Sequence, residues 1–508
     1  MKKTRRIAAM IAATALAATV VIPAMSFSAG AFDVTINQNA EDKGTHTYGA
    51  YQIFAGTLAA DGTLSNITWG SGITAAGQAE LGDAAAYAKT ITAATAPTKA
   101  AELAGYLASP ESTGSATIEG LTGGYYLIQD TVEPTGSPAS RTKFILKVVK
   151  DETVDVNVKS SVPSVEKKVQ DINDSEETPA LSGLQDSADY EIGDSIPYTI
   201  TATIGAGIEN FEKYSFEFHD DMSAGLSMDD TKAWKITIGG KDVTSNFTRT
   251  NDGNVYTWAV TDNDLKAYTY TEGGTESEGA LAAGDEVVLT YNAYLNASAV
   301  VGKAGNPNEV WLKFDNNPNS CGEGTPGAET PKDKNIVFTY QTVINKVDDK
   351  GAALVGANFT LFKKVGEDWV DVTTLGGTGG AKPTKTGDET GSTFTFTGLD
   401  DGDYKLSETA TPRGYDSISD IEFKITATHD ITSEDPKLTA LTGTGGITLT
   451  SDLDAGSLTG AIQNVPGSNL PSTGGIGTTL FILCGSIGAA ITGVYLVSRK
   501  RTKEEAAE

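Results

Sequence analysis

Lys346, Glu408 and Asn464 each stand in phase with apolar residues of an alternating, strand-like segment. Side chains two residues apart point to the same face of a strand, so we expect all three polar groups to face a core. Burying an ammonium without a partner costs on the order of several kcal/mol, so Lys346 should be neutral there. Because burial also raises the pKa of a carboxylic acid, a neutral amine and a protonated acid can coexist at such a site.

The same phase rule selects polar residues in the middle of the chain. Lys167 is in phase with the valines on either side of it, and Asn316 is in phase with the apolar residues before it. A shift of one residue would select Lys168 or Asn317 instead, because these residues adjoin the first pair. The middle of the chain therefore also has an inward amine and an inward amide. The amine belongs to Lys167 or Lys168, and the amide to Asn316 or Asn317.

The elements that must position these residues are β-strands. Short alternating stretches rich in Thr, Val, Tyr and Phe, such as residues 393–396, are separated by Gly, Asn and Asp turns such as residues 251–254. Helical periodicity is weak outside an Ala-rich stretch at residues 76–107, which predicts one or two surface helices inserted in the first domain. The pattern as a whole predicts a string of β-sandwiches.

An internal repeat sets the domain boundaries. Residues 398–408 align without gaps on residues 120–130, so the first and third domains share a strand-turn-strand unit. In the corresponding upstream segments, Gln38 stands where the third domain has Lys346. We expect a leader at 1–31, domains at 32–160, 161–332 and 333–467, and a C-terminal region at 468–508.

The N-terminal leader has the features of a secretory signal peptide. A basic start is followed by an apolar stretch at residues 7–22 and by small residues at 29–31. The mature chain should therefore begin near Phe32, outside the cell.

The C-terminal region has the order of a wall-sorting signal. An uncharged apolar run at 476–497 is long enough to span a bilayer, and the basic residues 499–501 behind it would stay in the cytoplasm. The pentapeptide before the run resembles that of sortase substrates, which a membrane transpeptidase cuts between Thr and Gly. Its residues are Leu470, Pro471, Ser472, Thr473 and Gly474.

Composition excludes several classes of function. A formal net charge of -28 argues against nucleic-acid binding. With Cys484 inside the apolar run, Cys321 is the one cysteine of the mature chain, so no disulfide can form within a subunit. The spacing of His46, His219 and His429 matches neither a zinc site nor a catalytic pair, so we expect surface histidines, no metal, no cofactor and no enzyme with turnover.

Several segments together carry a resemblance to a known family. Residues 190–198, 220–226 and 308–319 resemble the central domain of LPxTG major pilins, and residues 346–348 and 404–409 resemble their last domain. The chain thus resembles three-domain backbone pilins with immunoglobulin-like domains of the collagen-adhesin A and B types. The resemblance implies an all-β fold of three tandem immunoglobulin-like β-sandwiches, of B, A and B type in chain order.

The resemblance also implies what the inward polar residues do. The amine of Lys346 would attack the carboxamide of Asn464 in a spontaneous isopeptide reaction, with Glu408 moving the proton and ammonia leaving. The first domain, with Gln38, should have no such bond. The corresponding residues of the middle domain would be Lys167, Asn316 and the acid Asp220.

The implied function is that of the major structural subunit of a sortase-assembled pilus, on the surface of a Gram-positive bacterium and supporting adhesion. Thr473 would be joined to Lys159 of the next subunit, although the segment around Lys159 lacks the family's Tyr-Pro-Lys-Asn core, which leaves Lys147 and Lys150 as alternatives. Expected partners are copies of the same chain, pilin-type and housekeeping sortases and peptidoglycan, with a tip adhesin and a host receptor as candidates. The alternative function is a monomeric wall-anchored adhesin or a tip pilin that binds a host ligand.

Overall fold

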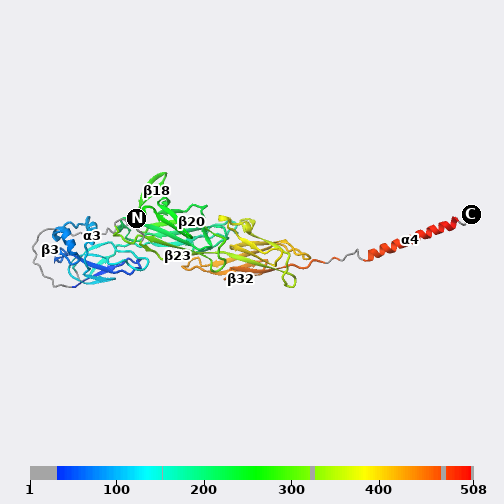
Figure 1. Cartoon of the computed structure of the whole chain (residues 1–508), viewed down its shortest axis with the longest axis horizontal. Helices are drawn as coiled ribbons and strands as arrows, with labels where there is room; N and C mark the ends of the chain where they lie inside the picture. The colour runs from blue at the N-terminus through cyan, green and yellow to red at the C-terminus, as the bar shows by residue number, and fades with distance from the viewer. Residues whose placement is uncertain (1–30, 151–152, 321–326, 469, 471–475, 505–508) are drawn as a thin grey trace, which may run out of the picture.

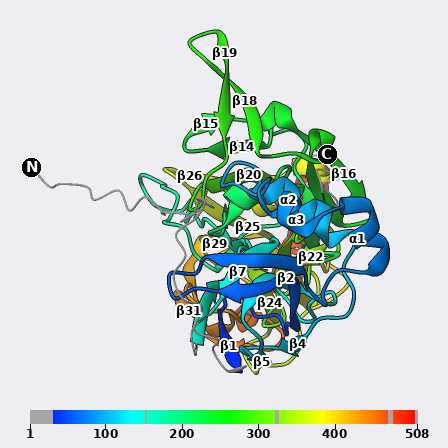
Figure 2. The same ribbon diagram turned by 90° about the vertical axis from the view of Figure 1, so that its left-hand side faces the viewer.

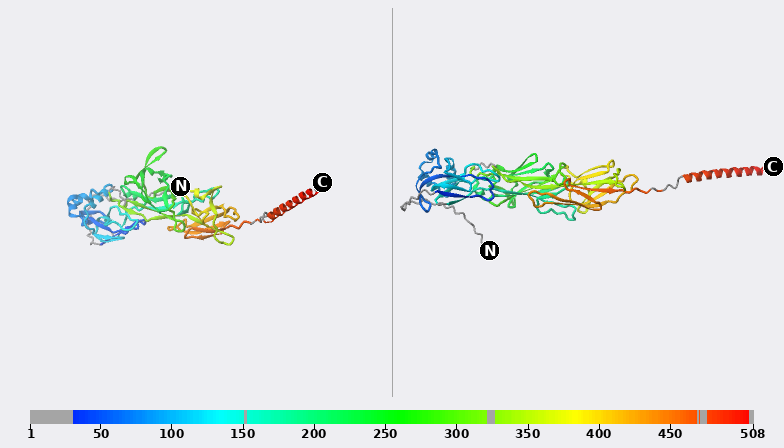
Figure 3. Two further views of the ribbon diagram at one scale, coloured as in Figure 1. Left: turned by 45° about the vertical axis from the view of Figure 1, so that its right-hand side comes forward. Right: turned by 90° about the horizontal axis from the view of Figure 1, so that it is seen from below.

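The chain forms three β-rich bodies in series, followed by a single long helix. The computed structural model describes residues 31–150, 153–320, 327–468, 470 and 476–504. Figure 1 shows the bodies along the long axis, with α4 (Ile476–Glu504) beyond the third, and the two views of Figure 3 agree. The predicted all-β fold of tandem sandwiches is confirmed.

The first body has two sheets and the predicted helical insertion. β1 lies between β5, which is antiparallel to it, and β8, which is parallel to it, while a second sheet has the order β3-β2-β6-β7 with β4 paired to β2. The helices follow β3 and precede β4. The elements are β1 (Phe32–Asn37), β2 (Tyr48–Leu58), β3 (Leu64–Trp69), α1 (Ala75–Leu81), α2 (Ala84–Ala88), α3 (Ala96–Ala104), β4 (Ser112–Gly114), β5 (Thr117–Leu121), β6 (Gly124–Asp130), β7 (Ile145–Val149) and β8 (Thr153–Asn157).

The middle body is a sandwich of a seven-stranded and a six-stranded sheet whose inner faces share one core. A hairpin of β18 and β19 projects from it, as Figure 2 shows. The elements are β9 (Ser164–Val169), β10 (Ser187–Asp189), β11 (Ser195–Thr203), η1 (Ile208–Asn210), β12 (Phe216–Met222), β13 (Leu226–Met228), β14 (Lys235–Ile238), β15 (Lys241–Asp242), η2 (Thr244–Asn246), β16 (Phe247–Asp252), β17 (Val255–Val260), η3 (Thr261–Asn263), β18 (Ala267–Glu272), β19 (Thr275–Ala280), β20 (Glu286–Leu295), β21 (Asn306–Phe314), β22 (Ala328–Glu329) and β23 (Asp333–Phe338).

The end of the middle body differs from the predicted boundary after residue 332. β23 pairs with β21 and β10, so it completes the seven-stranded sheet of the middle body. Residues 333–338 read locally as the start of the next domain, but their hydrogen-bond partners lie upstream. The middle body therefore extends to Phe338.

The third body repeats the strand pairing of the first. β24 lies between antiparallel β28 and parallel β33, as β1 lies between β5 and β8. Gly120 and Gly398, aligned in the repeat, both have positive φ (77° and 86°), which a residue with a side chain adopts at a cost. The elements are β24 (Tyr340–Val347), β25 (Asn358–Val365), β26 (Asp368–Asp371), η4 (Val372–Thr374), η5 (Thr378–Gly380), β27 (Thr384–Thr386), β28 (Thr393–Leu399), β29 (Gly402–Ala410), β30 (Ile421–His429), β31 (Leu438–Gly445), β32 (Leu449–Asp452) and β33 (Ser457–Gln463).

Helix α4 has the length and composition of a membrane span. Its segment Ile482–Arg499 has a mean hydropathy of 1.5 and no residue buried against the rest of the chain. It therefore stands apart from the three bodies, as expected of the apolar segment in a wall-sorting signal.

Candidate functional site

In the third body, Lys346 projects from β24 into the core. Its side chain is 0% exposed, and its Nζ donates a hydrogen bond of 3.1 Å to the carbonyl oxygen of Ile462 on β33. Burial lowers the pKa of Lys346, and the nearby Glu408 carboxylate offsets only part of this effect. The surroundings of Lys346 therefore favour the neutral amine more than water does.

Asn464 and Glu408 complete this site. Asn464 is fully buried two residues beyond Ile462, and its Nδ2 donates to Glu408 Oε1 at 3.0 Å. Thr411 Oγ1, at 2.9 Å, and the backbone amide of Ile418 hold the other carboxylate oxygen of Glu408. The structure thus brings together the amine, the amide and the acid that the sequence selected in this domain.

In the middle body, Lys167 lies in an aromatic enclosure. Its side chain is 0% exposed, with Nζ 5.0 Å from the centre of the Tyr198 ring and 5.3 Å from that of Tyr291. The amine contacts Asp220 Oδ2 and donates to Tyr291 Oη at 2.8 Å. Burial lowers the pKa of Lys167 although Asp220 and Asp333 oppose the shift. The sequence selected both Lys167 and Asp220.

The amide beside this pair belongs to Asn308, which the sequence reasoning missed. Asn308 is fully buried on β21, and its Nδ2 donates to Tyr291 Oη at 2.9 Å. Tyr291 Oη in turn donates to Asp220 Oδ2 at 2.7 Å. The alternation of β21 puts Asn308 on the same face as Leu312, so an inward Asn within the strand was the signal that could have found it.

Asn316 lies elsewhere, and the structure does not bring it to Lys167 as we predicted. β21 ends at Phe314, and the Asn316 side chain beyond it donates to Glu133 Oε1 of the first body at 2.8 Å. Asn317 lies in the same loop, where its backbone amide donates to Asp315. Both asparagines therefore belong to the junction between the first and middle bodies.

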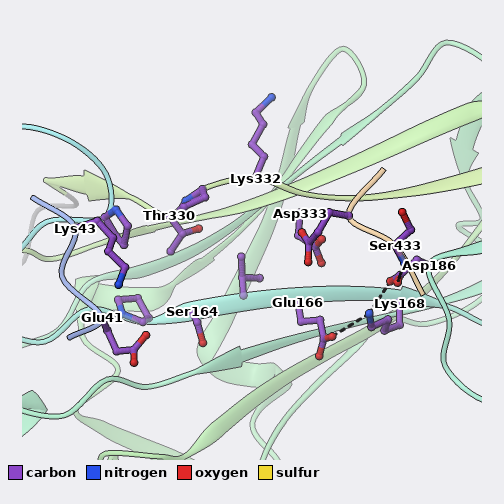
Figure 4. A pocket seen from close by; sticks show the side chains of 15 residues that line it. Glu41, Lys43, Ser164, Glu166, Lys168, Asp186, Thr330, Lys332, Asp333 and Ser433 are labelled. Atoms are coloured by element: carbon purple, nitrogen blue, oxygen red, sulfur yellow. Dashed lines mark hydrogen bonds and ion pairs between the residues drawn. The ribbon is translucent and has the colours of Figure 1, made fainter. Parts of the chain in front are cut away.

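Lys168, the alternative to Lys167, points out of the core. Figure 4 shows it in a groove of about 410 Å³, where its Nζ pairs with Asp186 Oδ1 at 2.6 Å and Glu166 Oε1 at 2.9 Å. The groove also contains Lys43 of the first body and Ser433 of the third. Its lining carries charges of both signs, so Lys168 is a paired surface cation.

Lys159 lies where the first body meets the middle one, between β8 and β9. Its backbone amide donates to Thr142 Oγ1 at 2.9 Å, and its carbonyl accepts from the amide of Lys143 at 3.0 Å. The side chain is exposed, yet partial desolvation and the neighbouring Lys143 ammonium lower its pKa. The alternative acceptors, Lys147 and Lys150, are less exposed than Lys159, and Lys150 Nζ donates a hydrogen bond to the carbonyl oxygen of Ala60.

The first body has other residues at the positions that form the site in the third. Gln38 is exposed beyond the end of β1, and Asp130 occupies the place of Glu408 in the repeat. His46 is buried between Asp130, at 2.8 Å, and Asp42, at 3.2 Å. In the first body, the residue that corresponds to Glu408 therefore pairs with a histidine.

The expectation of surface histidines is wrong. His46 and His219 are buried, and His429 is largely covered between Asp171 and Asp189. Each has an acidic side chain within 3.6 Å, which offsets the cost of burying the imidazole.

Some predicted residues lie outside the described part of the chain. These are the leader up to residue 30, Cys321, and Pro471, Ser472, Thr473 and Gly474 of the pentapeptide. Leu470 is described and exposed.

Three family models match separate parts of the chain. Residues 192–318 match "Gram-positive pilin backbone subunit 2, Cna-B-like domain", residues 341–437 match "Prealbumin-like fold domain", and residues 463–504 match "LPXTG cell wall anchor motif". The Cna-B-like description differs from the A type that we predicted for the middle domain.

Proteins that match two thirds or more of the chain include a streptococcal surface protein and two solved pilins. The trypsin-resistant surface T6 protein of Streptococcus pyogenes serotype M6 is 25% identical over 408 residues, which cover 68% of this chain and 70% of the relative. The solved T6 backbone pilin has a TM-score of 0.51 at 18% identity, with 86% of this chain and 98% of that one covered. The full-length major pilin SpaD of Corynebacterium diphtheriae, at 18% identity, has a TM-score of 0.46 and covers 87% and 98%.

Three β-sandwich bodies in series and a C-terminal anchor define the chain as a multidomain protein of a Gram-positive cell surface. Within that class its matched segments are those of LPXTG-anchored backbone pilins, as we predicted. It is the backbone subunit of a sortase-assembled pilus, attached to the cell wall.

Proposed function

We propose that pilin-type sortase joins Thr473 of one subunit to Lys159 of the next, and that each subunit contains two isopeptide bonds, Lys167–Asn308 and Lys346–Asn464. The observation that carries the proposal is the pair of buried amines with lowered pKa, each in a site with a carboxamide and a carboxylate. The middle-domain pair replaces the one predicted from the sequence.

The internal reaction needs no reagent from outside. The amine nitrogen attacks the amide carbon, the new C–N bond replaces the bond to Nδ2, and ammonia leaves. Asp220 and Glu408 accept the proton from the amine and return it to the leaving nitrogen. The fold supplies the proximity that an unactivated amide requires. Each reaction occurs once on its own chain, so the subunit is not an enzyme with turnover.

The two bonds have a mechanical purpose. Lys346 and Asn464 lie at the first and last strands of the third domain, and Lys167 and Asn308 lie on β9 and β21 of opposite sheets in the middle domain. Tension that enters such a domain passes through the covalent link, so the strands between the linked residues need not separate.

The placement of Lys159 supports its role as acceptor. It is exposed in the segment between β8 of the first body and β9 of the middle body, while α4, which follows Thr473 in the sequence, lies beyond the third body (Figure 1). A bond from Thr473 to Lys159 therefore extends the rod along its length. Sortase breaks the Thr473–Gly474 bond, the Lys159 amine takes the Thr473 carbonyl, and residues 474–508 are released. A final transfer to peptidoglycan anchors the base.

The test is an immunoblot of wall extract boiled in SDS, from cells that express the wild type, Lys159→Ala or the control Lys147→Ala. We expect a high-mass ladder in the wild type and the control and monomer alone in Lys159→Ala. A ladder in Lys159→Ala would move the acceptor to another lysine. Monomer alone in the wild type, with its sortase present, would favour a wall-anchored adhesin.

A further inference from the structure

The middle and third domains meet at a cluster of covered acidic side chains that the cross-linking sites do not use. It joins β10 of the middle domain to the turn between β28 and β29 of the third. Carboxyl groups outnumber basic groups there among the described residues. The carboxyl groups are those of Asp171, Asp174, Asp189, Glu191, Asp194, Asp400 and Asp401, and the bases among them are Lys363 and His429.

One half of the cluster already has its cation. Lys363 Nζ, fully buried on β25, lies 2.6 Å from Asp174 Oδ1, 2.6 Å from Glu191 Oε1 and 3.1 Å from Asp400 Oδ2. Desolvation opposes the charge on Lys363, but these carboxylates outweigh it and raise its pKa. This half is an ion network that holds the two domains together.

The other half shares its cations with further carboxylates, because Lys363, which contacts Asp400, also contacts Asp174 and Glu191, and His429, which contacts Asp189, also contacts Asp171. Asp189, Asp400 and Asp401 each present an oxygen within 4.8 Å of the others, a spacing that one ion with Ca–O distances of about 2.3–2.6 Å can bridge. Asp189 is 4% exposed, its Oδ1 lies 3.3 Å from His429 Nε2, and its Oδ2 has no hydrogen-bond partner among the described residues. Lys424 acts on Asp401 as a further cation.

A neutral oxygen also points into this half. Tyr340, at the start of β24, is fully buried, and its hydroxyl interacts electrostatically with Asp189, Asp400 and Asp401. It lies toward Asp189 and interacts with that carboxylate, but neither Tyr340 Oη nor Asp189 Oδ2 has a hydrogen bond of ordinary geometry among the described residues. A buried hydroxyl without a well-formed hydrogen bond is costly, and a bound ion or its water would offset that cost.

We infer that Asp189, Asp400 and Asp401 form a divalent-cation site, suited to Ca²⁺, that joins the middle domain to the third. The donors are oxygens, mainly carboxylates, which a hard cation such as Ca²⁺ prefers. Sites of extracellular modules bind Ca²⁺ with dissociation constants of about 10⁻⁴–10⁻³ M.

The site would stiffen the pilus rod at a joint that the two isopeptide bonds do not cross. Asp189 belongs to the middle domain and Asp400 and Asp401 to the third, so an ion among them restrains the angle between the domains. The inference does not depend on which lysine accepts Thr473, so the two proposals fail separately.

The experiment is calorimetric titration of Ca²⁺ into the fragment 32–468, which contains all three bodies and omits the detached α4. The wild type should bind one Ca²⁺ per chain, and Asp189→Asn and Asp401→Asn should each weaken binding at least about tenfold. Asp454→Asn is the control, because its side chain is 84% exposed and belongs to none of the clustered carboxyl groups, and it should bind as the wild type does.

Near-ultraviolet circular dichroism shows whether each aspartate variant folds. If one does not, Tyr340→Phe, which removes only the hydroxyl oxygen, replaces it in the titration and should weaken Ca²⁺ binding severalfold. No saturable binding to the wild type would overturn the inference. Equal binding by the wild type and the folded site variants would overturn it as well.

Discussion

Lys346 lies opposite Ile462 in the parallel pair of β24 and β33, so Asn464 follows on the same face of the sheet, one pleat further along. The amine and the amide are therefore brought together by the pairing of the first and last strands of their domain. The bond proposed between them can form only after that pairing, so its presence shows that the domain has folded correctly.

In the middle domain, Asn308→Ala should abolish the cross-link and Asn316→Ala should not. Intact mass of the fragment 32–468 measures this, since each bond removes one ammonia. We expect two losses in the wild type and in Asn316→Ala, and one in Asn308→Ala. Losing the bond should also lower the free energy of unfolding by about 4–5 kcal/mol, by analogy with a disulfide that closes a loop of this size. The opposite pattern of masses would restore the pair predicted from the sequence.

In the third domain, Glu408→Gln should stop or greatly slow bond formation. The glutamine keeps the shape of the side chain and a hydrogen bond to Asn464, but it cannot transfer a proton. Proton transfer by a positioned side chain contributes about 10²–10⁴-fold to the rate of such reactions. Peptide mapping after expression should find Lys346 and Asn464 unlinked. The control is Glu422→Gln, exposed on the neighbouring β30, where the linked peptide should persist. A linked peptide in Glu408→Gln at the wild-type level would exclude Glu408 as the proton carrier.

The first domain should lose stability as pH rises above neutrality, because of His46. Burial opposes the charge on this imidazole, but hydrogen bonds to Asp130 and Asp42 prevail and raise its pKa from 6.5 to about 9. Between these values the folded state binds more protons than the unfolded state, so the contribution is full below pH 6.5 and is lost as pH passes 9. The loss is at most about 3 kcal/mol.

Denaturant unfolding of the fragment 32–468 between pH 6 and 10 measures this effect through the first transition, since the first domain has no proposed cross-link. His46→Gln should be less stable than the wild type at pH 6 and should show a flatter pH dependence. His219→Gln, a change in the middle domain, should leave the slope of the first transition as it is. A slope unchanged by His46→Gln would assign the pH dependence to other groups.

The junction of the first two domains should loosen in Asn319→Ala. Asn319 Oδ1 accepts from the amide of Phe144 and its Nδ2 donates to the carbonyl of Thr142, each at 3.0 Å, and Thr142 in turn holds the backbone of Lys159. Removing both bonds should cost about 1–3 kcal/mol at the junction. Limited trypsin digestion should then cleave severalfold faster between residues 141 and 160. The control Asn251→Ala, in an exposed turn, should be digested at the wild-type rate. Digestion of Asn319→Ala at the wild-type rate would show that the Asn319 hydrogen bonds do not stabilise the junction.

Local patterns in the sequence predicted much of the fold and part of the sites. Strand alternation identified Lys167 and Lys346 as inward-facing, because a period of two depends only on neighbouring residues. The repeat predicted that the first and third domains share a strand-turn-strand unit, and the Ala-rich stretch predicted a helical insertion in the first domain, which the structure has between β3 and β4. The charged and apolar order of the two ends indicated export and anchoring without any reference to the fold.

Tertiary structure alone decided which partners meet. Asn308 and Asn316 share one phase, but the strand ends at Phe314, and pairing with β12 brings Asn308 to Asp220 through Tyr291. Residues 333–338 likewise joined the middle domain because their partners are β10 and β21. The face of the sheet to which a side chain points follows from the alternation within its own strand. Strand register and strand ends depend instead on hydrogen bonds to segments distant in the sequence.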